Sequence, residues 1–237
     1  MAKDILSDRR VKSRMILEIR YDPAIHVFDR RGVILDKVHS AFRSKMEHWR
    51  VQNAEVVMAD DFNSIGKTAQ LSHLRSSISY EDPDSRQEFV DDSLRFLDGF
   101  CDVFHEGLGT IKRMGFRSMS VLSWKECSNV ECCYEVVKAT FLKDKLPVDM
   151  SFTDCGVILQ NDNTRVYVGP FKRDEEWARQ TFSKPSENVP DFGIGLDVDC
   201  YALDLQYDSN AALRKAARAL QDLALAVESE VYAGLLA

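Results

Sequence analysis

Two segments of the chain, residues 15–21 and 111–124, alternate between apolar and charged residues, and this alternation constrains the fold more than any other feature. Apolar residues such as Leu17 and Phe116 recur at every second position. The charged residues on the opposite side are Glu18, Arg20, Arg113 and Arg117. Side chains on a strand point alternately to two faces, so both segments are predicted to lie in a sheet. One face of that sheet is buried, and the other is open to water or a partner.

The order of the predicted elements gives the architecture of the first half. Helical spacing of apolar residues over 33–46 predicts one helix, and a second helix is predicted to begin near Asp84, where the sequence resembles a capping box. Strand-forming residues over 48–58 and 68–80 predict two further strands. Residues 14–125 are therefore predicted to fold in the order β-α-β-β-α-β, which is the split βαβ or ferredoxin-like arrangement.

In a ferredoxin-like half the first and last strands are neighbours, so residues 15–21 and 111–124 are expected to lie side by side. The helices would cover their apolar side. Glu18 and Arg20 would then approach Arg113 and Arg117 across the strands, which favours cross-strand ion pairs.

The second half is less regular but contains the same kinds of element. The predicted elements are, in order, a helix over 129–142, strands over 150–159, 165–171 and 193–205, and a helix that begins after Ser209. No linker rich in Gly, Ser or Pro separates the halves at 125–131. We therefore expect an α+β protein with two ferredoxin-like (βαββαβ-type) halves, residues 14–125 and 126–237. The strands would be mainly antiparallel with helices on one face, in a continuous sheet or two packed sheets, and the halves would fold as one body.

The composition restricts the classes of partner. The net charge is −7, whereas a protein that binds duplex nucleic acid normally presents a basic surface, so generic nucleic-acid binding is disfavoured. No apolar run approaches the ~20 residues that cross a bilayer, and the first residues lack an apolar core. We expect no membrane association and a cytoplasmic location.

The six cysteines admit two interpretations. Without a secretory signal they are expected to be reduced thiols. The spacing of Cys127, Cys132 and Cys133, with Cys155 further on, invites a zinc site. Structural zinc usually takes pairs of cysteines two to four residues apart, and no histidine follows at matching spacing. Buried or incidental thiols are therefore favoured, and no metal or cofactor is expected.

Three short motifs resemble a known family. They are the LEIRYDP segment at 17–23, the IKRMGFR segment at 111–117 and the LDVDCY segment at 196–201. They are similar to the LEIRF-x-P, R-x-G-x-R and LDxD motifs of a sporadically distributed family of uncharacterised prokaryotic proteins. The resemblance implies an α+β body of no established activity. The patchy distribution of the family hints at mobile elements or phage defence.

The strongest candidate site is the polar sheet face. Its residues are Glu18, Arg20, Arg113, Arg117, Asp197 and Asp199. As a binding site, the arginines would clamp a phosphate or carboxylate, and the carboxylates would orient them. As a structural feature, they would be ion pairs on a face that the other half or a partner covers, and this interpretation is favoured. Asp197 and Asp199 could also hold a divalent metal, but no third ligand is visible.

No catalytic motif is present, so the catalytic residues stay unknown. The first functional hypothesis is a non-enzymatic binding or assembly protein, with a protein partner or self-association, as an accessory component of a bacterial defence or mobile-element system. The alternative is a nucleic-acid or phosphoester-processing enzyme that uses the arginines and aspartates of the sheet face. A third hypothesis is a sensor that holds a small anion between the halves.

Overall fold

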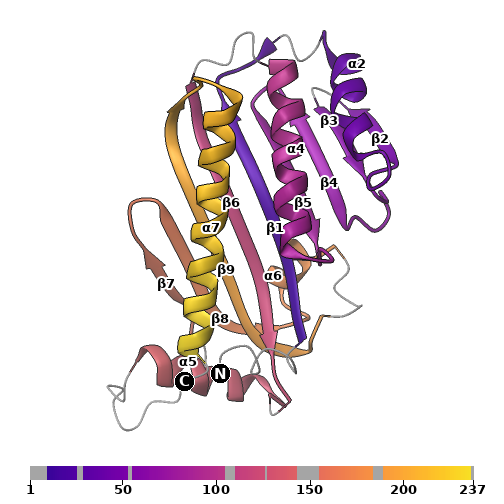
Figure 1. Ribbon diagram of the computed structural model, residues 1–237. Coiled ribbons are helices and arrows are strands. Elements are labelled where there is room, and N and C mark those ends of the chain that lie inside the picture. The colour runs from indigo at the N-terminus through magenta and orange to yellow at the C-terminus, as the bar shows by residue number, and fades with distance from the viewer. Residues whose placement is uncertain are drawn as a thin grey trace. The chain divides into compact units, whose positions relative to one another are not determined.

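The computed structural model describes residues 10–25, 29–52, 55–104, 110–125, 127–142, 155–183 and 189–235 (Figure 1). The protein is α+β, as expected. Its strands are β1 (Arg10–Tyr21), β2 (His48–Gln52), β3 (Glu55–Ala59), β4 (Lys67–Ser72), β5 (Arg75–Glu81), β6 (Thr110–Ser123), β7 (Val157–Gln160), β8 (Thr164–Lys172) and β9 (Phe192–Gln206). Its helices are α2 (Arg31–Ile34), η2 (Leu35–His39), α3 (Ser40–Phe42), α4 (Arg86–Phe104), α5 (Val130–Phe141), α6 (Glu176–Thr181) and α7 (Asn210–Leu235).

The strands form one large antiparallel sheet in the order β2-β3-β4-β5-β1-β6-β9-β8-β7. Strands β1 and β6 are neighbours, which confirms the expected pairing of residues 15–21 with 111–124. The two expected ferredoxin-like halves do not appear as separate sheets, because every described strand belongs to this single sheet of nine. Of the two arrangements expected, a continuous sheet is therefore the one found.

The chain divides into two compact units. Unit 1 consists of the described part of residues 1–14, 118–199 and 224–237, and unit 2 of the described part of 15–117 and 200–223. Strands β1, β6 and β9 and helix α7 contribute residues to both units. Most of the expected first half falls in unit 2, which also takes in a segment from the second half.

Unit 2 contains two hairpins where single strands were expected. Strands β2 and β3 pair in antiparallel register, with His48 opposite Ala59, so residues 48–58 are not one strand. Strands β4 and β5 likewise pair antiparallel, with Lys67 opposite Tyr80. The element order in this part of the chain is therefore β-α-β-β-β-β-α-β rather than the expected β-α-β-β-α-β.

A serine side chain makes the turn between β4 and β5. The Oγ of Ser72 accepts the backbone N–H groups of Leu74 and Arg75 at 3.3 and 3.2 Å. A hydroxyl that satisfies turn amides in this way can reverse a chain without glycine or proline. The hydroxyl of Tyr21 donates to the Ser72 carbonyl at 2.5 Å, so the turn is fastened to the end of β1.

The helices of unit 2 occupy the expected places. Helices α2, η2 and α3 follow one another without a break, and η2 is a π-helical segment. Helix α4 begins where Ser85 Oγ accepts the Glu88 N–H at 3.0 Å, so Ser85 rather than Asp84 caps it. A Cβ on Gly99 would lie 3.1 Å from Val38 Cγ2, so α4 approaches the η2 segment closely at the glycine.

The core of unit 2 lies between α4 and the sheet. The apolar positions that alternate along β1, Leu17 and Ile19, are fully buried. On α4, the Phe89 ring meets Tyr80 of β5 edge-on at 5.3 Å and Phe116 of β6 at 5.9 Å. The apolar face predicted from the alternation is therefore the face that α4 covers.

Unit 1 holds the remaining elements. Helix α5 confirms the predicted helix, and the Asn129 side chain accepts the Cys132 N–H at 2.9 Å as its cap. Strands β7 and β8 form an antiparallel hairpin, with Val157 opposite Val168. Of the strand expected over 150–159, residues 150–154 lie outside the described part of the chain. Helix α6 was not expected from the sequence.

Helices cover both faces of the sheet in unit 1, which corrects the expectation of helices on one face. On β6, Val121 packs with Phe171, Ala178 and Phe182 in an apolar cluster around α6. The adjacent Ser120 donates to Glu228 of α7 at 2.9 Å. Neighbouring strand residues point to opposite faces, so α6 and the C-terminal part of α7 lie on opposite sides of β6.

No helix within the described residues is both long and apolar enough to cross a membrane.

Candidate functional site

Three of the predicted site residues come together on the sheet face of unit 2. Glu18 accepts a hydrogen bond from Arg20 Nε at 2.7 Å, and both residues lie on β1. The Glu18 carboxylate is also 3.7 Å from an Nη of Arg113 on β6. Glu18 therefore lies between two guanidinium groups, and its approach to Arg113 confirms that part of the cross-strand prediction. Arg113 is held with 20% of its side chain exposed, whereas Arg20 keeps 56% exposed.

Two residues that the sequence did not assign to the site hold Arg113 in place. Its guanidinium carbon lies 5.0 Å from the centre of the Tyr201 ring on β9, a cation–π distance. A Cβ at Gly115 would lie 2.8 Å from the same guanidinium carbon. The arginine side chain therefore lies across the strand at Gly115, where only the absence of a side chain leaves room for it.

Two more residues extend this surface. Arg117 is exposed and lies on the same face of β6 as Arg113, since the two are four residues apart on one strand. Leu203 follows Tyr201 by two positions on β9, and 57% of it is exposed. We define the arginine patch as Glu18, Arg20, Arg113, Arg117, Tyr201 and Leu203, all in unit 2.

Asp197 and Asp199, the other two predicted residues, are not members of the arginine patch. Both belong to unit 1. Asp197 is buried, and Asp199 is half-buried. Both take part in interactions within the protein. Within the described ranges, no group of three or more His, Cys, Asp or Glu side chains could hold a metal ion.

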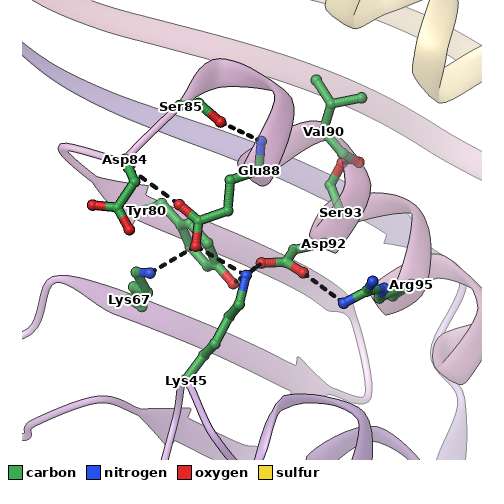
Figure 2. Close-up of polar contacts among 10 residues, drawn as sticks. All are labelled: Lys45, Lys67, Tyr80, Asp84, Ser85, Glu88, Val90, Asp92, Ser93 and Arg95. Carbon is green, nitrogen blue, oxygen red and sulfur yellow. Dashed lines mark hydrogen bonds and ion pairs between the residues drawn. The ribbon is translucent and has the colours of Figure 1, made fainter.

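A second polar cluster in unit 2 was missed at the level of sequence (Figure 2). Lys45 Nζ lies 2.9 Å from Glu88 Oε1 and 2.5 Å from Asp92 Oδ2. Lys67 Nζ reaches the same oxygen of Glu88 at 2.9 Å. The Tyr80 hydroxyl donates to Asp92 Oδ2 at 2.8 Å. We call these five residues the lysine–carboxylate cluster.

The charges of this cluster shift the pKa values of its members. Burial alone would raise the pKa of Glu88, but hydrogen bonds and charge attraction from Lys45 and Lys67 outweigh it and lower the pKa to about 2. Burial, and next the hydrogen bond to Asp92, raise the pKa of Tyr80. Burial opposes the charged form of Lys45, but the two carboxylates nonetheless raise its pKa.

The lysine–carboxylate cluster joins elements rather than presenting a reactive group. Its residues come from α4, from the β4–β5 hairpin and from the segment after α3. Each lysine is engaged by a carboxylate, and Asp92 has only 2% of its side chain exposed. One sequence signal points to it: Asp92 falls on the side of α4 that carries Phe89 and Phe96, where an acidic residue needs a cation.

A buried carboxylate in unit 1 has hydroxyl partners. Ser118 and Ser120 of β6 donate to the two oxygens of Glu228 at 3.0 and 2.9 Å, and all three residues are almost fully buried. Ser120 also shares a 2.5 Å hydrogen bond with the Tyr232 hydroxyl. These contacts fasten α7 to the sheet, and the polar serines of β6 are explained by them.

No family model matches the chain, and no curated protein matches it. The resemblance of the three short motifs to a known family therefore stays a prediction.

Proposed function

We propose that this chain is a non-enzymatic binding protein and that the arginine patch contacts a carboxylate-bearing surface of a protein partner. The observation that carries the proposal is the position of Arg113, whose guanidinium lies between the Glu18 carboxylate and the Tyr201 ring. A guanidinium held by its neighbours loses little rotamer freedom when a second carboxylate docks, so binding costs less entropy.

The composition of the arginine patch supports a protein partner. Arginine and tyrosine are enriched among the residues that contribute most to protein–protein binding. Leu203 adds an exposed apolar side chain beside these polar groups. The residues that define the patch include three arginines and one carboxylate, Glu18, on a chain whose net charge is −7. A second copy of the acidic chain is therefore one source of the complementary carboxylates.

The resemblance of the sequence motifs supports a wider biological setting. On that basis alone we place the chain in the cytoplasm of a prokaryote, as an accessory component of a defence or mobile-element system. The same proposal states that each half of the chain derives from a ferredoxin-like unit.

Light scattering and affinity capture from the native host test the proposal. The wild-type chain has a mass of 27.0 kDa, so self-association appears directly as a larger particle in light scattering. The informative variant is the double charge reversal Arg20→Glu with Arg113→Glu. Arg218→Glu is the matched control, because it is an exposed arginine of the same unit on helix α7, outside the arginine patch.

The expected result is an assembly, with itself or with a captured protein, that survives Arg218→Glu and is lost in the double variant. A strict monomer that captures nothing in a patch-dependent way contradicts the proposal. Hydrolysis of RNA, DNA or nucleotides with Mg²⁺ or Mn²⁺, lost in Asp199→Ala, would instead favour the phosphoester-processing alternative.

A further inference from the structure

Two cysteine sulfurs of unit 1 lie in direct contact without a bond between them. Cys127 Sγ and Cys133 Sγ are 3.1 Å apart, and both residues are free thiols. Cys127 precedes Asn129, the cap of α5, whereas Cys133 belongs to the first turn of that helix. Both thiols also lie within 3.9 Å of the Asn129 carbonyl oxygen, so the residue that caps α5 contacts both sulfurs.

The two thiols differ in their access to solvent. Cys133 is fully buried, and its environment includes the backbone at Gly193. Cys127 is half-buried and lines a cavity of about 330 Å³ together with Trp124, Lys125 and Asp191. A small oxidant or a low-molecular-weight disulfide therefore reaches Cys127 first, and the buried Cys133 reacts only with the oxidised Cys127.

The geometry requires little movement for bond formation. A disulfide has a sulfur–sulfur length of about 2.05 Å, so the two atoms must close by roughly 1 Å. Cys132 is the other thiol nearby. A disulfide between Cys132 and Cys133 would join two residues that are adjacent in the chain and already linked by a peptide bond, which disfavours it. The described residues offer no third ligand that would make these sulfurs a metal site.

We propose that Cys127 and Cys133 are a reversible oxidation site, in which a peroxide converts the pair into a disulfide. Cys127 attacks the peroxide, its sulfur takes one oxygen as a sulfenic acid, and one water leaves. Cys133 then attacks that sulfur, the S–O bond breaks and a second water leaves. Two thiols lose two electrons and two protons in all, and one peroxide is reduced to two waters. Two molecules of a thiol such as glutathione then reduce the disulfide by exchange: the first forms a mixed disulfide, the second releases it, both protein thiols are restored and glutathione disulfide leaves.

Mass spectrometry of the intact wild-type chain after treatment with hydrogen peroxide tests this. The expected product is lighter by two hydrogen atoms, and dithiothreitol restores the starting mass. Cleavage after glutamate separates residues 127–131, which contain Cys127, from residues 132–135, which contain Cys132 and Cys133. The oxidised protein should therefore yield these two peptides joined together.

Serine variants identify the second sulfur. Cys132→Ser should retain the joined peptides, because Cys133 remains, whereas Cys133→Ser should lose them. The same treatment in concentrated urea, where the native geometry is absent, should remove the preference for Cys133 over Cys132. A bond between Cys132 and Cys133, a bond from Cys127 to Cys132 in the folded chain, or oxidation that stops at sulfinic acid on Cys127 would overturn the proposal.

Discussion

Arg113 lies across Gly115, its neighbour at the second position along β6, and this relationship positions the guanidinium for both Glu18 and Tyr201. The glycine is therefore part of the arginine patch in effect, although it has no side chain to contribute. An R-x-G pattern on a strand is a simple device for laying a long cationic side chain flat against a sheet.

Replacing Gly115 with valine should displace Arg113 without unfolding the chain. The obstructing atoms belong to the end of a flexible side chain, and valine favours strands, so stability should change by less than about 1 kcal/mol. Partner binding should fall to the level of the Arg113→Glu variant. Denaturant unfolding and affinity capture measure the two effects. Gly32→Ala, where a Cβ meets nothing within 4 Å, is the control: it lies in helix α2, so alanine should raise stability by up to about 1 kcal/mol and leave partner binding unchanged.

Removing Asp92 should destabilise the protein. Asp92→Ala leaves the buried Tyr80 hydroxyl without its acceptor and Lys45 with Glu88 as its remaining carboxylate, which should cost about 1–3 kcal/mol. Asp98→Ala on the same helix is the matched control. Its ion pair with Arg214 leaves 44% and 43% of the two side chains exposed, so it should cost less than about 1 kcal/mol. Equal losses in urea titrations would contradict the structural role of the lysine–carboxylate cluster.

The stability of the fold should decline with acid in a window that Glu88 sets. Its pKa in the folded protein is about 2, below the ordinary value of 4.5, so the unfolded chain binds the proton more readily. The stabilisation is present above pH 4.5 and is lost as the pH falls from 4.5 towards 2. In Glu88→Gln, the unfolding free energy should depend less on pH over this acid range. An unchanged dependence on pH in that variant would show that Glu88 is not responsible.

Ser120→Ala should destabilise the chain through Glu228. The variant removes a hydroxyl donor from a buried carboxylate, which costs about 1–3 kcal/mol. Ser40→Ala is the control, because the Ser40 hydroxyl donates to a carbonyl at the exposed surface, and should be close to neutral. Thermal unfolding compares the midpoint temperatures of the two variants. A similar small decrease in both would show that Ser120 does not stabilise the buried Glu228.

The alternation of apolar and charged residues predicted β1 and β6 as strands, and the order of the elements predicted that they are neighbours and that Glu18 approaches Arg113. The β4–β5 hairpin was missed because its turn depends on the Ser72 hydroxyl rather than on glycine or proline. Strand periodicity continues through such a turn, so one long strand was predicted where two exist.

The sequence predicted only part of the candidate site, because it does not give the order of distant strands in the sheet. Charges at alternate positions identify a face, but they do not say which neighbouring strand completes it. Tyr201 joined the arginine patch because β9 lies beside β6, a long-range pairing that no local pattern encodes. Asp199 shares a strand with Tyr201 but belongs to the other unit.

Photocrosslinking in the native host tests the central claim most directly. A photoactivatable residue at Leu203 places the reactive group within the arginine patch, and the same residue at Leu223, another exposed leucine of unit 2 on helix α7, is the control. We predict a protein adduct from position 203 that is absent from position 223 and disappears when Arg20 and Arg113 are reversed to glutamate. Equal adducts from both positions, or adducts at 203 made only of nucleic acid, would contradict a protein-binding arginine patch.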